Sequence, residues 1–444
     1  MAGRELSAAG IPVIILEAAS QPGGRIRTLQ GTSPGSPAFP TSPASPTSPA
    51  SPASPPNGEF SGPVEAGAEF VHGQLPLTLG LLRTAGIGYR PVKGKMVRVT
   101  KGKWGGGDLF SGDWGELMEK MWELQQDISI AAFLEGRFPG DRYAALRNSI
   151  RGFAEGYDLA DIQRASTLAL YKEWQEEGET EYRIDGGYGR LVQYLVDQCL
   201  AHGGRIEYNA PVNSIQWEKD KVTVTTAAGS SFTGSRVIVT VSLGILQQEP
   251  EALTPQPAAS PAAISFFPPI PAYRQAARHL GYGTVIKILI EFRRPFWEPA
   301  AAGIGFILSD EAVPTWWLQA PDASSLITGW LTGESMRNFQ TLDEAAQLAA
   351  CLIALASIFA VTPSFLREQL LAFRVNDWMR APFVQGGYSY ETVGCSSARE
   401  QLMQPVEGTL YFAGEALFEG SALATVEAAL TSGQAAAKKI IAQS

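Results

Sequence analysis

An acidic residue followed by glycines and arginines is the first group in this chain whose spacing could do chemistry. The apolar run 11–16 ends in Glu17. Four further candidates follow it within ten residues: Gly23, Gly24, Arg25 and Arg27. Paired glycines let a backbone approach a pyrophosphate, two arginines could neutralise its charge, and an acid at a strand end suits ribose hydroxyls. We predict a dinucleotide site here rather than an ordinary strand-to-helix turn.

A lysine inside an apolar strand segment is the second candidate. Lys287 lies between Val285-Ile286 and Ile288, in a run that predicts a strand from 287 to 292. Burying an ammonium is costly unless a partner or a reaction uses it. The alternative is a side chain whose head reaches water at the strand end. From these residues alone this alternative is the preferred interpretation.

The elements that must position these groups alternate between helices and strands. Residues 4–10 predict the last turns of a helix, and segment 64–73 predicts a tight, glycine-punctuated loop. Strands are predicted at 11–17, 206–215, 221–226, 236–240 and 409–414. Residues 75–175 are predicted to be largely helical, with a small hairpin near 97–104. Further helices are predicted at 345–359 and from about 425. This alternation predicts an α/β fold with an interleaved second domain.

The early position of Glu17 is unusual for a dinucleotide-binding βαβ unit. There the acid follows a strand and a G-x-G-x-x-G turn by about 20 residues. We therefore expect this chain to lack that first strand and its glycines, which would leave sheet edges exposed. A start codon assigned too far downstream is the preferred explanation, and a relic with half of the usual nucleotide contacts is the alternative.

Composition excludes several classes of function. A net charge of −9 and a pI near 5.1 disfavour nucleic-acid binding, which needs a basic surface. Three cysteines and three histidines are too scattered to predict a zinc site, another metal site or a disulfide framework. The apolar stretch 345–361 is short for a membrane span and predicts a buried helix. We expect a cytoplasmic protein without membrane contact, while a targeting segment lost with the N-terminus stays open.

Residues 33–56 form a proline- and serine-rich insertion built from Ser-Pro-Ala and Ser-Pro-Thr units. Such a composition cannot bury a core and predicts a solvated, disordered loop. A tolerated surface insertion is preferred over a partner-binding tract, because lengthening a loop costs little entropy.

Six ordered blocks of residues resemble the flavin-containing amine oxidases, a family of monoamine, polyamine and L-amino-acid oxidases and lysine-specific histone demethylases. The blocks are Glu17 with Gly23-Gly24-Arg25, 67–73 (GAEFVHG), 239–246 (VTVSLGIL), Lys287 with Phe296-Trp297, Trp378 with 386–389 (GGYS), and 410–415 (LYFAGE) with Thr425-Val426. The resemblance covers the chain outside the insertion. It implies an architecture like that of amine oxidases and glutathione reductase.

The same resemblance implies two domains. A discontinuous Rossmann-like FAD-binding domain would comprise 1–74, 187–264 and 381–444. An α+β substrate-binding domain would comprise 75–186 and 265–380. The residues implied to contact FAD are Glu17, Gly23, Gly24, Arg25, Arg27, Gly67, Ala68, Glu69, Phe70, Val212, Gly414, Glu415, Thr425 and Val426. Backbone N–H groups of the last two, at a helix N-terminus, would stabilise negative charge on the reduced flavin.

Catalytic roles are implied for Lys287, Tyr388, Trp378 and His72. Lys287 matches the family lysine that holds a water beside flavin N5 and assists the reaction with oxygen. Tyr388 and Trp378 match aromatics that wall the substrate side of the flavin, where they would attract an amine and exclude water. Core packing is the alternative for both. His72 matches a residue near the substrate amine, and Glu69 is either a cation ligand or a loop acid.

Departures from the family pattern narrow the predicted mode of FAD binding and the predicted substrate class. Gly387 precedes Tyr388 where covalent relatives carry cysteine, so FAD is expected to be non-covalent. Thr425 occupies the place of a second cage aromatic. The 69–72 loop lacks the arginine of snake-venom-type amino-acid oxidases, although Arg380 could serve a carboxylate. Insertions that recruit chromatin partners are not evident.

The expected reaction is oxidation of a small monoamine or polyamine to an imine and then an aldehyde, with O2 reduced to H2O2. An L-amino-acid oxidase, or another FAD oxidase or desaturase of the superfamily, is the alternative enzyme. A truncated, non-catalytic relic with weak or no FAD binding is the alternative outside catalysis. The sequence leaves the oligomeric state open.

Overall fold

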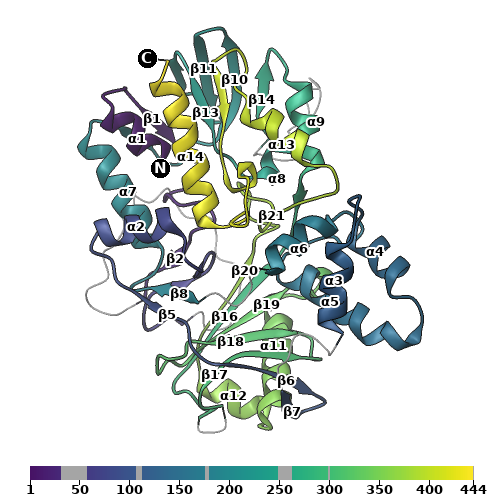
Figure 1. Cartoon of the computed structure of the whole chain (residues 1–444). Helices are drawn as coiled ribbons and strands as arrows, with labels where there is room; N and C mark the ends of the chain where they lie inside the picture. Colours follow the sequence, from purple (N-terminus) through teal and green to yellow (C-terminus); the bar gives the residue numbers. More distant parts are fainter. Residues whose placement is uncertain (32–57, 107–112, 176–179, 249–262, 299–300, 444) are drawn as a thin grey trace.

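A computed structural model describes residues 1–31, 58–106, 113–175, 180–248, 263–298 and 301–443. The insertion predicted at 33–56 lies outside these residues. Figure 1 shows two halves: short strands with α1, α7 and α14 in one, and a long sheet with α11 and α12 in the other. The mixed α/β fold predicted from the alternation of elements is confirmed.

Two short parallel ladders belong to the half that contains α1, α7 and α14. Strand β1 (Ile14–Leu16) pairs with β9 (Arg205–Glu207), and β13 (Val237–Val239) pairs with β22 (Leu410–Phe412). Helices beside them are α1 (Ala2–Ala8), α7 (Gly189–Ala201) and α14 (Val426–Ile441). Both pairs run parallel. Within the described residues each ladder has two strands, and Ile14 on β1 is 45% exposed.

The single strand predicted at 206–215 is wrong. Strand β9 ends at Glu207, and β10 (Val212–Glu218) begins five residues later. Between them Asn209 adopts φ 53°, a left-handed conformation that asparagine tolerates better than most residues, and it turns the chain.

A four-stranded sheet continues from this turn. Its order is β12 (Ser231–Gly234), β11 (Lys221–Thr226), β10 and β14 (Ser265–Phe267). Three helices pack in the same core: α8 (Leu243–Leu246), α9 (Pro271–His279) and α13 (Ser396–Met403). Val239 of β13 and Phe412 of β22 pack in the same core, which joins this sheet to the second parallel ladder.

A seven-stranded sheet forms the other half. Its order is β20 (Leu370–Asp377), β16 (Ile286–Phe292), β19 (Leu326–Leu331), β18 (Thr315–Leu318), β17 (Ile304–Ser309), β6 (Lys95–Thr100) and β7 (Lys103–Gly106). Three helices cover one face: α10 (Gly333–Gln340), α11 (Glu344–Phe359) and α12 (Pro363–Gln369). The predicted hairpin near 97–104 is the β6–β7 pair.

The period of two along β16 divides its side chains between two faces. Ile286, Ile288 and Ile290 join the core beneath α11. Lys287 and Glu291 therefore point to the opposite face, although every residue of this strand is buried. The strand therefore places Lys287 on the face turned away from the α11 core.

Small strands link the halves. The predicted loop at 64–73 is instead bounded by β3 (Val64–Glu65) and β4 (Phe70–His72), because each end finds a strand partner. Strand β3 pairs with β2 (Thr28–Leu29), and β4 joins β8 (Glu181–Ile184) and β5 (Tyr89–Pro91). The other linking elements are β15 (Gly281–Tyr282), β21 (Ser389–Tyr390) and α2 (Pro76–Thr84).

A separate group of helices packs against itself on one side of the molecule (Figure 1). Its members are α3 (Trp114–Trp122), α4 (Ile130–Arg137), α5 (Ala144–Gly156) and α6 (Thr167–Gln175), with a 3-10 turn at Asp141–Tyr143. Another 3-10 turn spans Glu415–Leu417. In the described part of the chain no single helix is long and apolar enough to cross a bilayer, whereas the bent pair α11 and α12 meets that test only when combined.

Candidate functional site

One cavity of about 2410 Å³ runs between the two halves. All but one of the residues predicted for the site line it: Glu17, Gly23, Gly24, Arg25, Gly67, Ala68, Glu69, Phe70, His72, Val212, Lys287, Trp378, Tyr388, Gly414, Glu415, Thr425 and Val426. The exception is Arg27. Its charge lies near those of Glu17 and Arg374, and burial lowers the pKa of Arg27. Its contact with a cofactor stays a prediction.

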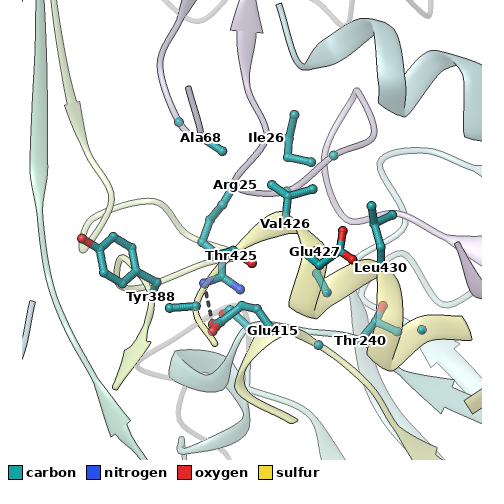
Figure 2. Close-up of a pocket in the computed structure, with 18 of the residues that line it drawn as sticks. Arg25, Ile26, Ala68, Thr240, Tyr388, Glu415, Thr425, Val426, Glu427 and Leu430 are labelled. Atoms are coloured by element: carbon teal, nitrogen blue, oxygen red, sulfur yellow. Dashed lines mark hydrogen bonds and ion pairs between the residues drawn. The ribbon is translucent and has the colours of Figure 1, made fainter. Parts of the chain in front are cut away.

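The glycine-arginine loop holds one guanidinium at the cavity wall. Gly23 has φ 117°, and a Cβ there would lie 2.6 Å from the Ile26 carbonyl oxygen, so the turn requires glycine. Arg25 Nη1 donates to Glu415 Oε1 at 2.8 Å and to the Gly387 carbonyl at 2.7 Å. Figure 2 shows this pair below the first turn of α14. The Arg25 side chain remains 25% exposed, so its charge is available to an anion in the cavity.

The N-terminus of α14 opens onto the same space. Thr425 is the N-cap, and its hydroxyl accepts from the Ala428 N–H at 3.3 Å. The next residues, Val426 and Glu427, also line the cavity, so the positive end of the helix dipole faces it. Figure 2 shows these three residues beside the Arg25 side chain and above Glu415.

The carboxylate of Glu427 serves a neighbouring helix. It accepts from the backbone N–H groups of Leu77 at 2.9 Å and Thr78 at 2.7 Å, and from the Thr78 hydroxyl at 2.7 Å. Helix α2 has no side-chain cap at its own N-cap, Leu75, so Glu427 supplies one. The sequence pattern did not predict this role of Glu427, although an acid in the first turn of a helix was visible in it.

Glu17 stands at the end of β1, as its sequence position predicted. Its Oε1 accepts from the Ala19 N–H at 2.8 Å. Burial raises the pKa of Glu17, while the backbone hydrogen bond and the Arg27 charge oppose this increase. Val212 lines the same end of the cavity.

Lys287 is fully enclosed by other groups. Its side chain is 1% exposed, and Nζ donates to the Gly67 carbonyl at 3.0 Å and to Glu69 Oε2 at 2.8 Å. The alternative that its head reaches bulk water is therefore wrong. The ammonium also lies 5.3 Å from the centre of the Trp317 ring.

Glu69 joins this lysine to a second cation. Arg183 Nε donates to Glu69 Oε1 at 2.9 Å, and Trp317 Nε1 donates to the same oxygen at 3.0 Å. Burial would raise the pKa of Glu69, but the charges of Lys287 and Arg183 outweigh it and hold that pKa at about 2. The sequence pattern did not predict a role for Arg183. It lies, like Lys287, as a single cation inside a strand segment.

Gly67 lies close to the Arg25 backbone and to the Trp378 side chain at the cavity wall. Trp378 Nε1 donates to the Ala66 carbonyl at 3.0 Å. A Cβ at position 67 would lie 1.9 Å from the Arg25 carbonyl oxygen, so no larger residue fits. Trp378 therefore supports the loop that carries Glu69 as well as lining the cavity.

Aromatic residues surround the part of the cavity beyond Lys287. The Tyr388 hydroxyl donates to the Tyr157 carbonyl, and Tyr157 stacks on Phe153 with ring centres 5.2 Å apart. Burial raises the pKa of both tyrosines, so their phenols stay protonated at neutral pH. His72 meets the edge of Tyr157 and pairs with Glu181 at 2.9 Å (Nδ1 to Oε1). The sequence predicted Tyr388 and His72, but not Tyr157 or Glu181.

The family profile described as "Flavin containing amine oxidoreductase" matches residues 1–92 and 114–441. Among curated proteins, lysine-specific histone demethylase 1 homolog 3 of Oryza sativa subsp. japonica is 25% identical over 94% of this chain and 49% of its own length. Polyamine oxidase 1 of the same organism is 26% identical over 64% of this chain and 60% of its own length.

This chain spans only part of the curated relatives it matches. The share is 14% of an Arabidopsis thaliana demethylase homologue and 26% of Mus musculus lysine-specific histone demethylase 1B. Solved structures match almost completely. Putrescine oxidase bound to putrescine gives a TM-score of 0.75 at 19% identity, covering 99% of this chain and 96% of that one. Cyclohexylamine oxidase from Brevibacterium oxydans gives 0.73 at 18%, covering 100% and 96%.

Proposed function

This chain belongs to the flavin-containing amine oxidoreductase family, and on that premise we propose that it binds FAD and oxidises an amine with O2. The overall reaction would convert amine, O2 and water to an aldehyde, ammonia or a shorter amine, and H2O2. FAD, when bound, supplies the acceptor for a hydride from the α-carbon and is reoxidised by O2. The observation that carries the proposal is Lys287, buried at the wall of a cavity that also contains an arginine-bearing loop and a helix N-terminus.

The residues present fit this cofactor. Its pyrophosphate needs a close backbone and a cation, which Gly23 and the part-exposed Arg25 provide. Its ribose needs an acceptor at a strand end, and Glu17 stands there. Its isoalloxazine needs a donor-rich helix end, which Thr425 and Val426 offer. Gly387 carries no sulfur for a thioether, so we propose non-covalent binding.

The amine would be held among the aromatic residues. Tyr388 and Tyr157 present uncharged rings to the cavity, which favour an amine and exclude water from the nascent imine. Lys287 keeps its ammonium at the wall of the same space through Gly67 and Glu69. These residues bind and orient, while the cofactor carries the electrons.

A second cation on the substrate is favoured by His72 and Glu181. Both line the cavity beside Tyr157, and the Glu181 carboxylate is 25% exposed. A carboxylate there could receive a distal ammonium when His72 is neutral. We therefore rank diamines and polyamines above monoamines. The similarity to putrescine oxidase and to polyamine oxidase 1 supports this order.

The amino-acid alternative needs a cation for the substrate carboxylate. Arg380, the residue suggested for that role, is 65% exposed, donates to the Gln340 carbonyl at 3.0 Å and is not part of the cavity wall. We therefore rank L-amino-acid oxidation below amine oxidation. The demethylase relatives share the family, but the chain spans half or less of their length.

The test begins with the purified chain and its absorbance spectrum, with and without added FAD. Anaerobic addition of spermine, putrescine, tyramine and leucine should bleach the flavin bands for amines, with H2O2 released on admitting oxygen. Because the neutral amine reacts, the rate of bleaching should rise with pH towards the pKa of the amine. A colourless protein that takes up no FAD would support the non-catalytic alternative, and bleaching by leucine alone would support amino-acid oxidation.

A further inference from the structure

Resting on the proposed FAD chemistry, we propose that Glu69 is a positioning residue that keeps Lys287 charged and fixed at the cavity wall. From the sequence, Glu69 was expected to contact FAD and to be either a cation ligand or a loop acid, and no role towards Lys287 was predicted. The proposal depends on the contacts around three side chains that different elements bring together.

The ammonium of Lys287 is held from one side. Among the described residues two acceptors are bonded to it, the Gly67 carbonyl and Glu69 Oε2. An ammonium has three N–H donors, so one remains for an acceptor inside the cavity that Lys287 lines. Both bonded acceptors come from the same short loop, and the direction of the third donor is therefore set by that loop.

The carboxylate of Glu69 is in turn fixed by several donors. Trp317 Nε1 lies 3.0 and 3.1 Å from its two oxygens, and Arg183 Nε lies 2.9 Å from Oε1. Arg183 is itself anchored, with 3.2 Å bonds to the Leu318 and Ala320 carbonyls. A carboxylate with these bonds cannot rotate away from the lysine.

The charges in this cluster are unequal. One anion, Glu69, serves two cations, Lys287 and Arg183, and all three side chains are less than 10% exposed. Glu65 also lies close enough for its charge to act on Lys287, but burial raises the pKa of Glu65 to about 7. Without Glu69, an enclosed ammonium would face a guanidinium, an arrangement that favours the neutral amine.

A merely structural cross-link is the alternative. The cluster does join β4, β8, β16 and β18, since its members stand in or beside those strands. However, Glu69, Trp317 and Lys287 line the cavity, whereas Arg183 lies behind them. The anion therefore stands between an anchoring cation and a cation at the wall, which a cross-link alone would not require.

The first experiment needs neither FAD nor amine. Lysine labelled with 13C at Cε is incorporated, and the Lys287 signal is assigned by its absence in Lys287→Arg. In Glu69→Gln this signal should titrate at least one pH unit lower than in the unaltered protein. The same titration in both proteins would overturn the proposal.

The matched control is Glu291→Gln. Glu291 is a buried carboxylate on the same strand as Lys287, bonded to the Ser61 N–H at 2.8 Å and to its hydroxyl. This substitution removes a buried charge from β16 without touching the lysine. The Lys287 signal should titrate in Glu291→Gln as it does in the unaltered protein. If its titration changed equally in Glu291→Gln and Glu69→Gln, the cause would be general damage to the fold, and the specific role of Glu69 would be overturned.

The second experiment uses the FAD-loaded protein but no amine. Flavin reduced by light and EDTA is mixed with oxygen, and its reoxidation is followed across pH. Glu69→Gln should slow reoxidation several-fold at high pH, with the pH profile displaced downward, and Glu69→Asp should restore part of the rate. If the protein oxidises no amine, the proposed function fails while both readouts still test Glu69. An unchanged profile in Glu69→Gln would overturn the positioning role.

Discussion

Two buried charge clusters flank the cavity and differ in how they face it. On the side of α14, Arg25 pairs with Glu415, one cation to one anion, and the arginine is 25% exposed. On the sheet side Glu69 serves Lys287 and Arg183, which are 1% and 8% exposed. Both clusters join residues far apart in the chain. The exposed fraction of the cation is the difference: Arg25 can still reach a ligand in the cavity, whereas the two sheet-side cations are held in place by protein groups.

The difference has an energetic consequence. A part-exposed guanidinium keeps some contact with water, so its partner is only one of several groups that stabilise it. Two enclosed cations have no such alternative and depend on their shared anion. The sheet-side cluster should therefore be the more sensitive to loss of its acid.

The largest expected effect is on stability when each acid loses its charge. Glu69→Gln should lower the free energy of unfolding by about 3–5 kcal/mol, because it leaves two buried cations without an anion. Glu415→Gln should cost about 1–2 kcal/mol, because Arg25 can still be solvated. Urea denaturation followed by tryptophan fluorescence measures both. Equal losses would show that exposure does not distinguish the clusters.

Glu65 sharpens the comparison because it is a part-buried acid bonded to Thr28 and the Tyr188 N–H rather than to a cation. Burial raises its pKa from 4.5 to about 7. Between these values the unfolded chain releases the proton first, so the free energy of unfolding should fall with pH by about 3 kcal/mol. Glu65→Gln should remove that decrease in pH-dependent denaturation.

Glu69 should have the opposite effect on the pH dependence of the free energy of unfolding. Its folded pKa is about 2, below the ordinary 4.5, so its contribution is present above pH 4.5 and is lost as pH falls towards 2. Two carboxylates four residues apart therefore act in different pH windows. Identical pH profiles for the Glu65→Gln and Glu69→Gln variants would contradict this assignment.

Replacement of Arg25 and replacement of Arg183 should affect the affinity for FAD differently. Arg25→Met should weaken FAD binding by about tenfold or more, since a charge-assisted hydrogen bond to an anion contributes about 1.5–3 kcal/mol. Arg183→Met should change it little, because Arg183 is not part of the cavity wall. Quenching of FAD fluorescence during titration of the apoprotein measures both. A comparable loss in Arg183→Met would refute the division of roles.

The smallest effect concerns the helix end between the clusters. Thr425→Ala should cost about 1 kcal/mol through loss of the N-cap of α14 and should also weaken FAD binding. Thr362→Ala is the matched control, because Thr362 caps α12 in the same way but does not line the cavity. Melting temperature and FAD titration together distinguish the two. Equal FAD affinity in both variants would show that the α14 terminus is not a cofactor contact.

Much of the fold followed from local patterns. The apolar run predicted a strand from 287 to 292, and β16 spans Ile286–Phe292. The acid-glycine-arginine run predicted a binding loop after a strand, and its glycines and Arg25 line the cavity. Thr425 was placed at a helix start and is the N-cap of α14. Such features depend on neighbours within a few residues, so a sequence contains them directly.

Other features depend on tertiary contacts, so local sequence patterns did not predict them. The segment 206–215 was expected to be one strand, but a left-handed Asn209 divides it. Segment 64–73 was expected to be a loop, but its ends pair with distant strands. Strand pairing is decided by partners elsewhere in the chain, which a local pattern does not identify.

The sequence by itself determined which groups are present: a lysine in an apolar strand, glycines beside arginines, and acids in turns. Only the tertiary structure decided their pairing, which joins Lys287 to Glu69 across 218 residues and Arg25 to Glu415 across 390. The physical reason is that a charge acts according to its burial and the distance to its counter-ion. Both quantities exist only once β8, β16 and the loop before β4 have packed together.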